Sequence, residues 1–470
     1  MTLEKFRQLI KEKTELFKQL PDKHIRIISH LDCDGLTSAA IIIKTLTREN
    51  LNFSISIVKQ LDPTILDELS REEYNCYIFT DLGSAYLNLI EKKLPKKDIF
   101  VLDHHRPEEI KNKIHHINPH NFNIDGSKDI SGAGVTYLFA KALNEQNKDL
   151  AHLAIIGAIG DIQEKKGFTG LNQEILEDAT TSGKMEVKKG LSMFGSQTRP
   201  LHKVLEFSTE PYIPGVTGNE QGAIKFLNEL GISVKDQQGK NKKLIHLSEE
   251  DMKKLITGII IRRLGSEKNP DDIIGKIYLL TEELEESPTK DAREFSTLLN
   301  SCGRLRKPSL GIGTCLGNKK IKKEAIKLLG DYKQELIRSL NWFYSNRGNE
   351  KIIEKDGYVI INAEENIKDT LIGTLASIIS RSNIYREGTI IISMANTLDG
   401  NIKISLRLVG INPNIDLRKI IKDIIKKLGI GEVGGHKQAC GCLIPQEKEK
   451  EFITTAEEAL KKQVMEETVK

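Results

Sequence analysis

Aspartate and histidine residues gather in short clusters within the first 161 residues, and most of these clusters directly follow a short apolar segment. Because ligands of an open parallel sheet bind outside the carboxyl ends of its strands, we expect the clusters to converge on one crevice. Together they supply five aspartates and three histidines: His30, Asp32, Asp34, Asp81, Asp103, His104, His105 and Asp161.

Cations are the chemical reason to bring so many acidic side chains together. Five neighbouring carboxylates would repel one another and raise one another's pKa values unless positive charge compensated them. Oxygen and imidazole ligands without thiolates suit divalent ions such as Mn²⁺ or Mg²⁺ before Zn²⁺. The set is too large for one ion and fits two ions that share a bridging aspartate. Two ions roughly 3.5–4 Å apart activate a water and stabilise a leaving oxygen, which is the chemistry of phosphoester hydrolysis.

Each of these residues also has a simpler explanation. A single aspartate after a strand is usually a helix N-cap or a turn residue, and a single histidine is usually a satisfied polar residue. Three strand ends that carry the same chemistry in chain order favour the metal site. Gly35 would let the backbone turn tightly into a helix whose first N–H groups face anions, and Cys33 would point away as a spacer.

The elements that must position these residues follow an alternating pattern. Short apolar strands alternate with helical patterns of the length that crosses between parallel strands, which predicts a parallel α/β sheet. The predicted strands are 24–29, 54–58, 76–80 and 98–102, and the predicted helices are 36–46, 134–143 and 150–159.

The rest of the chain divides into two further parts. Residues 184–342 carry Gly, Pro and Thr punctuation followed by charged helical stretches, which predicts a largely helical insertion. The last part returns to strand patterns at 357–361, 389–393 and 401–409, with helices at 370–380 and 447–470. We therefore expect an N-terminal α/β domain, a helical insertion and a smaller C-terminal α/β domain, with the boundaries 1–185, 186–345 and 346–470.

Composition limits the class of protein. The 470 residues carry 70 Lys and Arg against 66 Asp and Glu, and 39% are hydrophobic, which excludes a disordered tail, a collagen and a membrane bundle. The apolar stretch 153–159 is too short to cross a bilayer, and the N-terminus lacks the apolar segment of a signal peptide. The six cysteines contain no CxxC pair, so we expect reduced, mostly buried thiols in a cytoplasmic protein with no membrane partner.

Taken together, the clusters resemble the four motifs of the DHH phosphoesterase superfamily. The shared motifs are His30-x-Asp32-x-Asp34-Gly35, Asp81, Asp103-His104-His105 and Gly160-Asp161. The segment Gly434-Gly435-His436, with Ser405-x-Arg407 before it, resembles the DHH-associated domain, and residues 295–308 resemble the archaeal RecJ-type exonucleases. The resemblance implies a parallel-sheet DHH catalytic domain and a smaller α/β DHH-associated domain that binds substrate, separated by the insertion.

The resemblance also implies a role for each clustered residue. One metal ion would be held by His30, Asp32 and Asp81. The other would be held by Asp34, Asp81, His104 and Asp161, so that Asp81 bridges the two ions. Asp103 would orient this ligand shell or join it, and His105 would contact the scissile phosphate or protonate the leaving oxygen. Two divalent ions, Mn²⁺ before Mg²⁺, are the implied cofactors.

Substrate binding is implied for residues outside the first domain: Asn300, Arg304, Ser405, Arg407, Gly434, Gly435 and His436. Relatives often have Gly-Gly-Gly-His in the last motif, and here Val433 replaces the first glycine. A plain turn, a solvated strand face and a surface helix that ends before a proline explain these residues equally well without the resemblance. Since only 5% of the residues are aromatic, contacts to the nucleic-acid backbone should dominate over base stacking.

The expected function is therefore an exonuclease that hydrolyses single-stranded DNA or RNA to mononucleotides, in DNA repair or replication. One alternative is a phosphodiesterase of small substrates, such as short oligonucleotides, cyclic dinucleotides or pyrophosphate. Another is a replisome scaffold, and the resemblance implies association with the GINS replication complex in either case. The polarity of digestion, the preferred sugar and the oligomeric state stay open.

Overall fold

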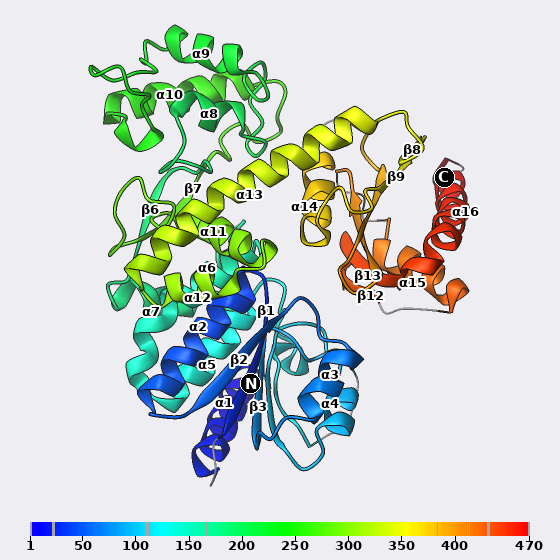
Figure 1. Cartoon of the computed structure of the whole chain (residues 1–470). Helices are drawn as coiled ribbons and strands as arrows, with labels where there is room; N and C mark the ends of the chain where they lie inside the picture. The colour runs from blue at the N-terminus through cyan, green and yellow to red at the C-terminus, as the bar shows by residue number, and fades with distance from the viewer. Residues whose placement is uncertain are drawn as a thin grey trace. The chain divides into compact units, whose positions relative to one another are not determined.

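The computed structural model describes residues 2–20, 24–108, 113–165, 167–382, 384–410, 412, 414–429 and 433–468. The chain divides into two compact units, Met1–Leu329 and Gly330–Lys470, which we call unit 1 and unit 2 (Figure 1). Within the described ranges, no helix combines the length and the apolar character needed to span a membrane.

Unit 1 is built on a five-stranded parallel sheet of order β2-β1-β3-β4-β5. The predicted parallel α/β class is confirmed, and β5 is the strand that the sequence pattern did not show. β5 has only three residues, two of which are histidines, so it lacks an apolar run. The strands are β1 (Ile25–His30), β2 (Phe53–Val58), β3 (Cys76–Thr80), β4 (Asp98–Leu102) and β5 (His115–Ile117).

Helices cover both faces of this sheet, with α1, α2 and α5 on one face and α3 and α4 on the other (Figure 1). Alternate residues of the buried strands supply the two cores: Phe100 packs against Phe17 and Phe139 on the first face, whereas Tyr77 and Phe79 pack toward α3 and α4. These helices are α1 (Thr2–Gln19), α2 (Cys33–Arg48), α3 (Pro63–Ser70), α4 (Leu87–Lys93) and α5 (Gly132–Leu143).

A second layer of helices packs on α2 and α5. Helix α6 is apolar all round because α2, α5, α7 and α11 surround it. The close packing is visible at Gly303 of α11, where a Cβ atom would lie 1.7 Å from the carbonyl oxygen of Leu31. Part of the predicted insertion therefore rests directly on the loop after β1. The helices are α6 (Ala151–Gly160), α7 (Gly170–Thr181), α11 (Ala292–Arg304) and α12 (Pro308–Cys315).

The middle of the chain is largely helical, as predicted, and has its own apolar core. Two strands that the sequence did not predict, β6 and β7, pair antiparallel and enclose this helical segment in sequence. Its elements are β6 (Met185–Leu191), α8 (Leu201–Glu206), α9 (Glu220–Glu229), α10 (Glu249–Arg263) and β7 (Ile274–Leu280), and α13 (Lys319–Asn346) follows α12. Short 3₁₀ helices occur at Pro119–Phe122, Glu145–Leu150, Leu244–His246 and Gln446–Lys448.

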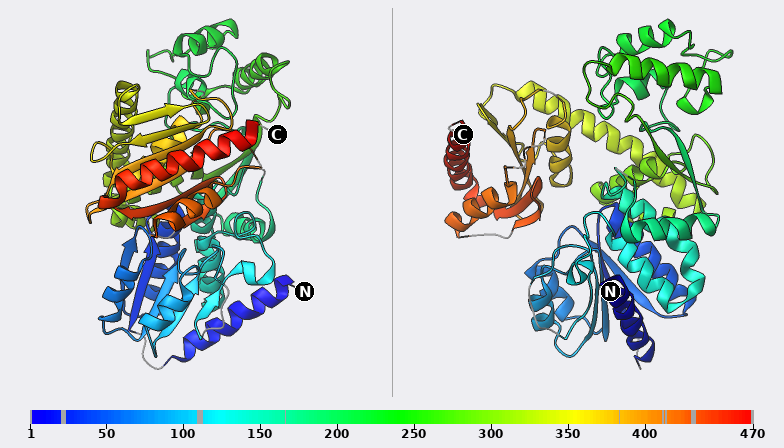
Figure 2. Two further views of the ribbon diagram at one scale, coloured as in Figure 1. Left: turned by 90° about the vertical axis from the view of Figure 1, so that its right-hand side faces the viewer. Right: turned by 180° about the vertical axis from the view of Figure 1, so that it is seen from behind.

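Unit 2 contains a six-stranded sheet of order β12-β13-β11-β10-β9-β8, in which only β9 and β10 pair in parallel. Helix α14 covers one face, and α15 and α16 cover the other (Figure 2). The strands are β8 (Ile352–Lys355), β9 (Tyr358–Asn362), β10 (Ile390–Asn396), β11 (Asn401–Leu408), β12 (Val433–His436) and β13 (Ala439–Pro445). The helices are α14 (Asp369–Ile379), α15 (Leu417–Leu428) and α16 (Glu449–Thr468).

Candidate metal centre

The first part of the site forms where β1 ends and α2 begins. Asp32 is the N-cap of α2, and its Oδ1 accepts a hydrogen bond from the backbone N–H of Gly35 at 3.0 Å. Its other oxygen lies 2.9 Å from Nδ1 of His30, the last residue of β1. A Cβ atom on Gly35 would lie 2.3 Å from the carbonyl oxygen of His30. Glycine is thus required for α2 to start this close to the strand.

Asp34 is held by the start of another helix. Its carboxylate accepts hydrogen bonds from the backbone N–H groups of Gly132 at 2.6 Å and Ala133 at 3.0 Å, in the first turn of α5. The N-terminus of a helix attracts negative charge, so α5 both orients and stabilises this buried carboxylate. Gly132 was not among the residues expected from the sequence, although the run Ser131-Gly-Ala-Gly, with Ser131 as N-cap, is a recognisable helix start.

Asp81 lies at the centre of the site, directly after β3. Its backbone φ is 59°, in the left-handed region that aspartate tolerates better than most residues. The side chain is buried, yet neither of its oxygens accepts a hydrogen bond from the residues that the structure describes. One oxygen lies 3.4 Å from Nδ1 of His30 and the other 3.4 Å from Nε2 of His104. Two buried lone-pair groups without donors are what a bound cation would satisfy.

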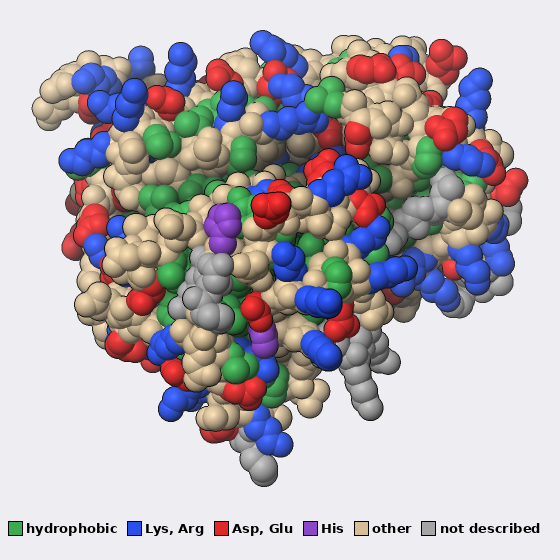
Figure 3. Space-filling model, turned by 60° about the horizontal axis from the view of Figure 1, so that its bottom comes forward, with side chains coloured by type: hydrophobic (Ala, Val, Ile, Leu, Met, Phe, Trp, Pro, Cys, Tyr) green, Lys and Arg blue, Asp and Glu red, His purple; other side chains and the backbone are tan. Residues whose placement is uncertain are grey.

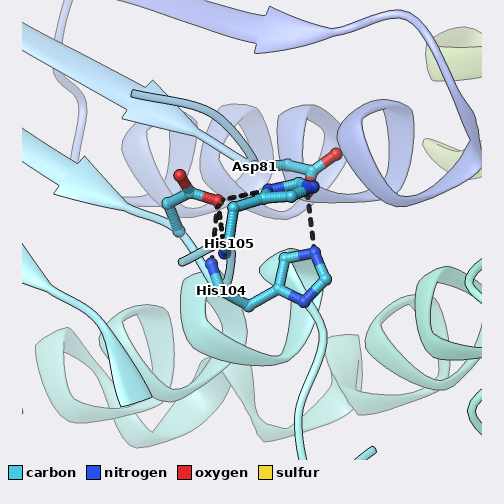
Figure 4. Close-up of side chains that lie close together, drawn as sticks. Asp81, His104 and His105 are labelled. Carbon is cyan, nitrogen blue, oxygen red and sulfur yellow. Dashed lines mark hydrogen bonds and ion pairs between the residues drawn. The ribbon is translucent and has the colours of Figure 1, made fainter. Parts of the chain in front are cut away.

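His104 follows β4, and its ring faces the carboxylate of Asp81 (Figure 4). Its Nδ1 donates to the carbonyl oxygen of Gly126 at 2.6 Å, so the other nitrogen, Nε2, is directed at the carboxylates. Nε2 lies 3.3 Å from Asp161, 3.4 Å from Asp81 and 3.7 Å from Asp34. Burial lowers the pKa of His104, but these carboxylates raise it well above its ordinary value, which shows how strongly the site attracts positive charge.

Asp103 and His105 form a pair beside this point. Oδ1 of Asp103 accepts hydrogen bonds from the backbone N–H groups of His104 and His105 and from Nδ1 of His105 at 2.8 Å, and Oδ2 accepts from the N–H of Ser84. Burial lowers the pKa of His105, but the Asp103 carboxylate raises it above its ordinary value. The His105 side chain is 41% exposed, so its ring is held at one nitrogen and accessible from solvent.

The buried carboxylates of the centre favour the binding of cations. Burial, followed by the charges of Asp81 and Asp161, raises the pKa of Asp34 well above its ordinary value. Burial also raises the pKa of Asp161 to about 7. Burial and mutual repulsion therefore disfavour the ionised form of both carboxyl groups, and divalent ions would offset this effect.

The side chains divide into sets that could each hold an ion, with ligand atoms within 4.8 Å of one another. The first set is His30, Asp32 and Asp81, and the second is Asp34, His104 and Asp161. Asp81 touches both sets, since its two oxygens point to one histidine of each. A further grouping joins Asp81 to Asp103, His104 and His105. The eight residues that the sequence singled out thus lie together, and the donor types fit two divalent ions.

Of the two predicted substrate residues of α11, Asn300 contacts the first motif of this centre, and Arg304 is the last residue of the same helix. Oδ1 of Asn300 accepts a hydrogen bond at 3.1 Å from the backbone N–H of Cys33, between two aspartates of the first motif. Arg304, one turn later, is half-buried at the end of α11.

Ile162, which was not expected at the site, follows Asp161 at a φ of 60° and is 55% exposed. A β-branched residue rarely occupies this conformation, so no sequence signal marked it.

In unit 2, the predicted substrate residues share one sheet. Ser405 and Arg407 lie on the face of β11 that α14 covers, where Nε of Arg407 donates to Oγ of Ser377 at 2.8 Å. Gly434 and Gly435 are exposed on the edge strand β12, and a φ of 106° at Gly435 requires glycine. In the register of the sheet, Gly441 of β13 pairs with Ser405 on one side and Gly434 on the other. His436 is the last residue of β12.

Known protein families match three parts of the chain. The DHH family, N-terminal domain, matches residues 24–158, the DHH-CID domain matches residues 193–276, and the DHHA1 domain matches residues 356–462. The order of the three domains and the donor set at the strand ends define a DHH-type phosphoesterase. The chain thus carries the DHH, DHH-CID and DHHA1 domains of the DHH superfamily, and its fold is RecJ-like.

Similar proteins extend over nearly the whole chain. The uncharacterized protein MJ0831 of Methanocaldococcus jannaschii is 29% identical over 97% of this chain and 99% of its own length. The crystal structure of RecJ from Thermus thermophilus in complex with Mn²⁺ has 15% identity and a TM-score of 0.58, and 97% of this chain spans 55% of that RecJ chain. Exonuclease RecJ bound to manganese has 15% identity and a TM-score of 0.56, with 96% and 94% covered. CDC45 from Entamoeba histolytica has 12% identity and a TM-score of 0.61, with 98% of both chains covered.

Proposed function

We propose that this chain is a two-metal phosphodiesterase that acts as an exonuclease on single-stranded DNA or RNA and releases mononucleotides. The observation that carries this proposal is the buried, unpartnered acceptor set of Asp81, surrounded by two histidines and three further aspartates. Neither oxygen of Asp81 accepts a hydrogen bond from the described residues, and bound divalent cations would satisfy both oxygens. The RecJ-like fold supports the choice of a polynucleotide substrate.

The ligands would divide as the geometry groups them. One ion would lie among His30, Asp32 and Asp81, and the other among Asp34, Asp81, His104 and Asp161. Bound ions would activate a water and neutralise charge on the phosphate oxygens, as in other two-metal hydrolases. Mn²⁺ is the first choice because carboxylate and imidazole ligands suit it, and the similar RecJ structures contain it.

The chain's own residues would prepare this chemistry. The N–H groups at the start of α5 hold Asp34, and the carbonyl oxygen of Gly126 fixes the ring of His104, so neither side chain must reorganise. Asp103 holds His105 at Nδ1, and the exposed ring would donate a proton to the leaving oxygen. Asn300 and Arg304 would position the phosphate next to the first motif.

Unit 2 would bind the nucleic-acid strand. We assign this role to Ser405, Arg407 and the segment Gly434–His436. In the register of the sheet, Ser405 of β11 and Gly434 of β12 pair with the same residue of the strand between them, and so do Arg407 and His436. The exposed glycine pair allows close approach of a phosphate to the backbone N–H groups of the edge strand.

Substrate length separates this proposal from a phosphodiesterase of small substrates. Turnover of a dinucleotide and of a ~20-residue single strand, compared at equal concentrations with Mn²⁺, decides between them. We expect a higher kcat/KM for the long strand. A strong preference for the dinucleotide, or for a cyclic dinucleotide or pyrophosphate, would favour the small-substrate class.

Partners and place in the cell are further parts of the proposal. We propose a cytoplasmic protein of DNA repair or replication that associates with the GINS complex, as the family resemblance implies. A pull-down with purified GINS subunits at low salt tests this association. The complete ligand set argues against a role as a scaffold alone, since a scaffold needs no buried carboxylates without donors.

A further inference from the structure

Helix α15 of unit 2 has a solvent face that is almost entirely basic. Its exposed residues are Lys419, Lys422, Asp423, Lys426 and Lys427, which recur at the spacing of a single helix face. The opposite face is apolar and buried in the core of unit 2. Half-buried Arg418 adds a fifth cation at the start of the helix. Figure 3 shows Lys and Arg side chains gathered at the right-hand side of one face of the molecule.

The four lysines are not used to stabilise the fold. None of them forms an ion pair with another residue in the part of the chain that the structure describes. Half-buried lysines elsewhere in unit 2 do pair, for example Lys351 with Glu364 and Lys448 with Glu451. The one acidic residue of the face, Asp423, cannot balance four positive charges, and like charges at this spacing repel one another. A polyanion is the partner that this surface complements.

The position of α15 identifies the polyanion. The backbone N–H of Leu417, the first residue of α15, donates to the carbonyl oxygen of Lys437 at 2.9 Å, directly after the strand that carries Gly434 and Gly435. The helix also packs along β12 and β13. The first turn of α15 therefore lies close to the strand that carries the glycine pair, and the lysines from Lys419 to Lys427 extend ~12 Å along the helix at 1.5 Å per residue.

We propose that the basic face of α15 binds the phosphate backbone of a single-stranded nucleic acid. This inference rests on the proposed function and deepens it, because it gives the chain a second contact with long substrates that a dinucleotide lacks. Lysine side chains bind the charge of the phosphates and do not read bases here, so the proposed contact is independent of sequence.

Binding without hydrolysis tests the inference. The full-length chain is titrated with a fluorescent ~20-nucleotide single strand in EDTA, at several salt concentrations, as wild type and as the Lys422→Gln/Lys426→Gln double variant. Each phosphate contact on a single strand contributes about 0.7 to the slope of log K against log salt. The double variant should therefore lose about 1.4 from the slope and bind about 25-fold more weakly at 0.1 M salt. Asp423→Asn should bind more tightly than wild type.

The matched control is Lys450→Gln/Lys461→Gln, which removes the same charge from the exposed face of α16 in the same unit. Unchanged binding by the α15 double variant, or an equal loss in the α16 control, overturns the inference. Release of mononucleotides from the ~20-nucleotide strand by the wild type with Mn²⁺ is measured in parallel. If that activity is absent while the α15 effect is present, the proposed function fails and the basic surface stands.

Discussion

The ring of His104 donates its Nδ1–H to the carbonyl oxygen of Gly126 at 2.6 Å, and this bond points Nε2 at three carboxylates. A carbonyl oxygen can only accept, so the proton on Nδ1 is fixed by chemistry. Nε2 is then the nitrogen that can release its proton and supply a lone pair to a metal ion. The bond thus prepares an imidazole for a cation before any cation binds.

This arrangement predicts two bound ions in the wild type and the loss of one in His104→Ala. The second ligand set loses its only imidazole, whereas His30, Asp32 and Asp81 remain. Isothermal titration with Mn²⁺ gives the stoichiometry. His246→Ala is the control, because His246 pairs with Glu286 away from the centre. Two ions in both variants would contradict the assignment.

Asp103→Asn should lower kcat without removing metal ions. Asp103 holds His105 through Nδ1 and the backbone, and an amide cannot reproduce this set of acceptor bonds. We expect kcat to fall by about 10²-fold or more, as for other misoriented proton donors. The Mn²⁺ stoichiometry should stay at two. A variant that loses both ions would show that Asp103 is a ligand and not a positioning residue.

Two glycine substitutions should have opposite effects on stability. In Gly35→Ala the new Cβ would meet the carbonyl oxygen of His30 at 2.3 Å, so we expect a loss of about 1–3 kcal/mol. Gly330 lies inside α13 with no atom within 4 Å of its added Cβ, so Gly330→Ala should gain about 0.5–1 kcal/mol from helix propensity. Thermal unfolding of both variants measures the two shifts. Equal shifts would show that the first turn of α2 is not tightly packed against β1.

The pH dependence of stability should contain a contribution from His116. Burial lowers the pKa of His116 from 6.5 to about 4, because its protonated form loses solvent. The unfolded chain then binds the extra proton between these values, so stability falls as pH drops from 6.5 toward 4. His116→Gln, which can still bond to Ser84, should reduce this fall in urea-unfolding experiments. An unchanged pH profile would show that His116 is solvated in the folded chain.

The residues of the centre could be found from the sequence because they follow strands whose apolar runs are unambiguous. β3 and β4 have the predicted bounds 76–80 and 98–102, and the order of parallel strands then brings their ends together. The contacts that hold the side chains could not be found in this way. Gly126 and Gly132 act through backbone groups, which any residue possesses, so only the fold shows which N–H or C=O meets the site.

The elements that the sequence pattern did not reveal fall into three groups, each with its own cause. β12 contains two glycines and β5 two histidines, so neither strand has the alternation of apolar residues that signals a strand. β6 and β7 lie in the middle of the chain, where the helical pattern of the neighbouring segments dominates the sequence. Helix α15 has clear amphipathic spacing, and it was missed because strand patterns before it set the interpretation of that region.

The central claim, that buried carboxylates without donors await divalent ions that hydrolyse nucleic acid, is tested most directly at Asp81. End-labelled single-stranded DNA and RNA are incubated with Mn²⁺ and either wild-type or Asp81→Asn chain, and the metal-free Tm of both proteins is measured. The substitution keeps the size and shape of the side chain but removes the charge that both ion sites share. We predict mononucleotide products from the wild type only, and a cooperative metal-free thermal transition of the variant shows that it is folded. Near-normal digestion by a folded Asp81→Asn chain would contradict the account.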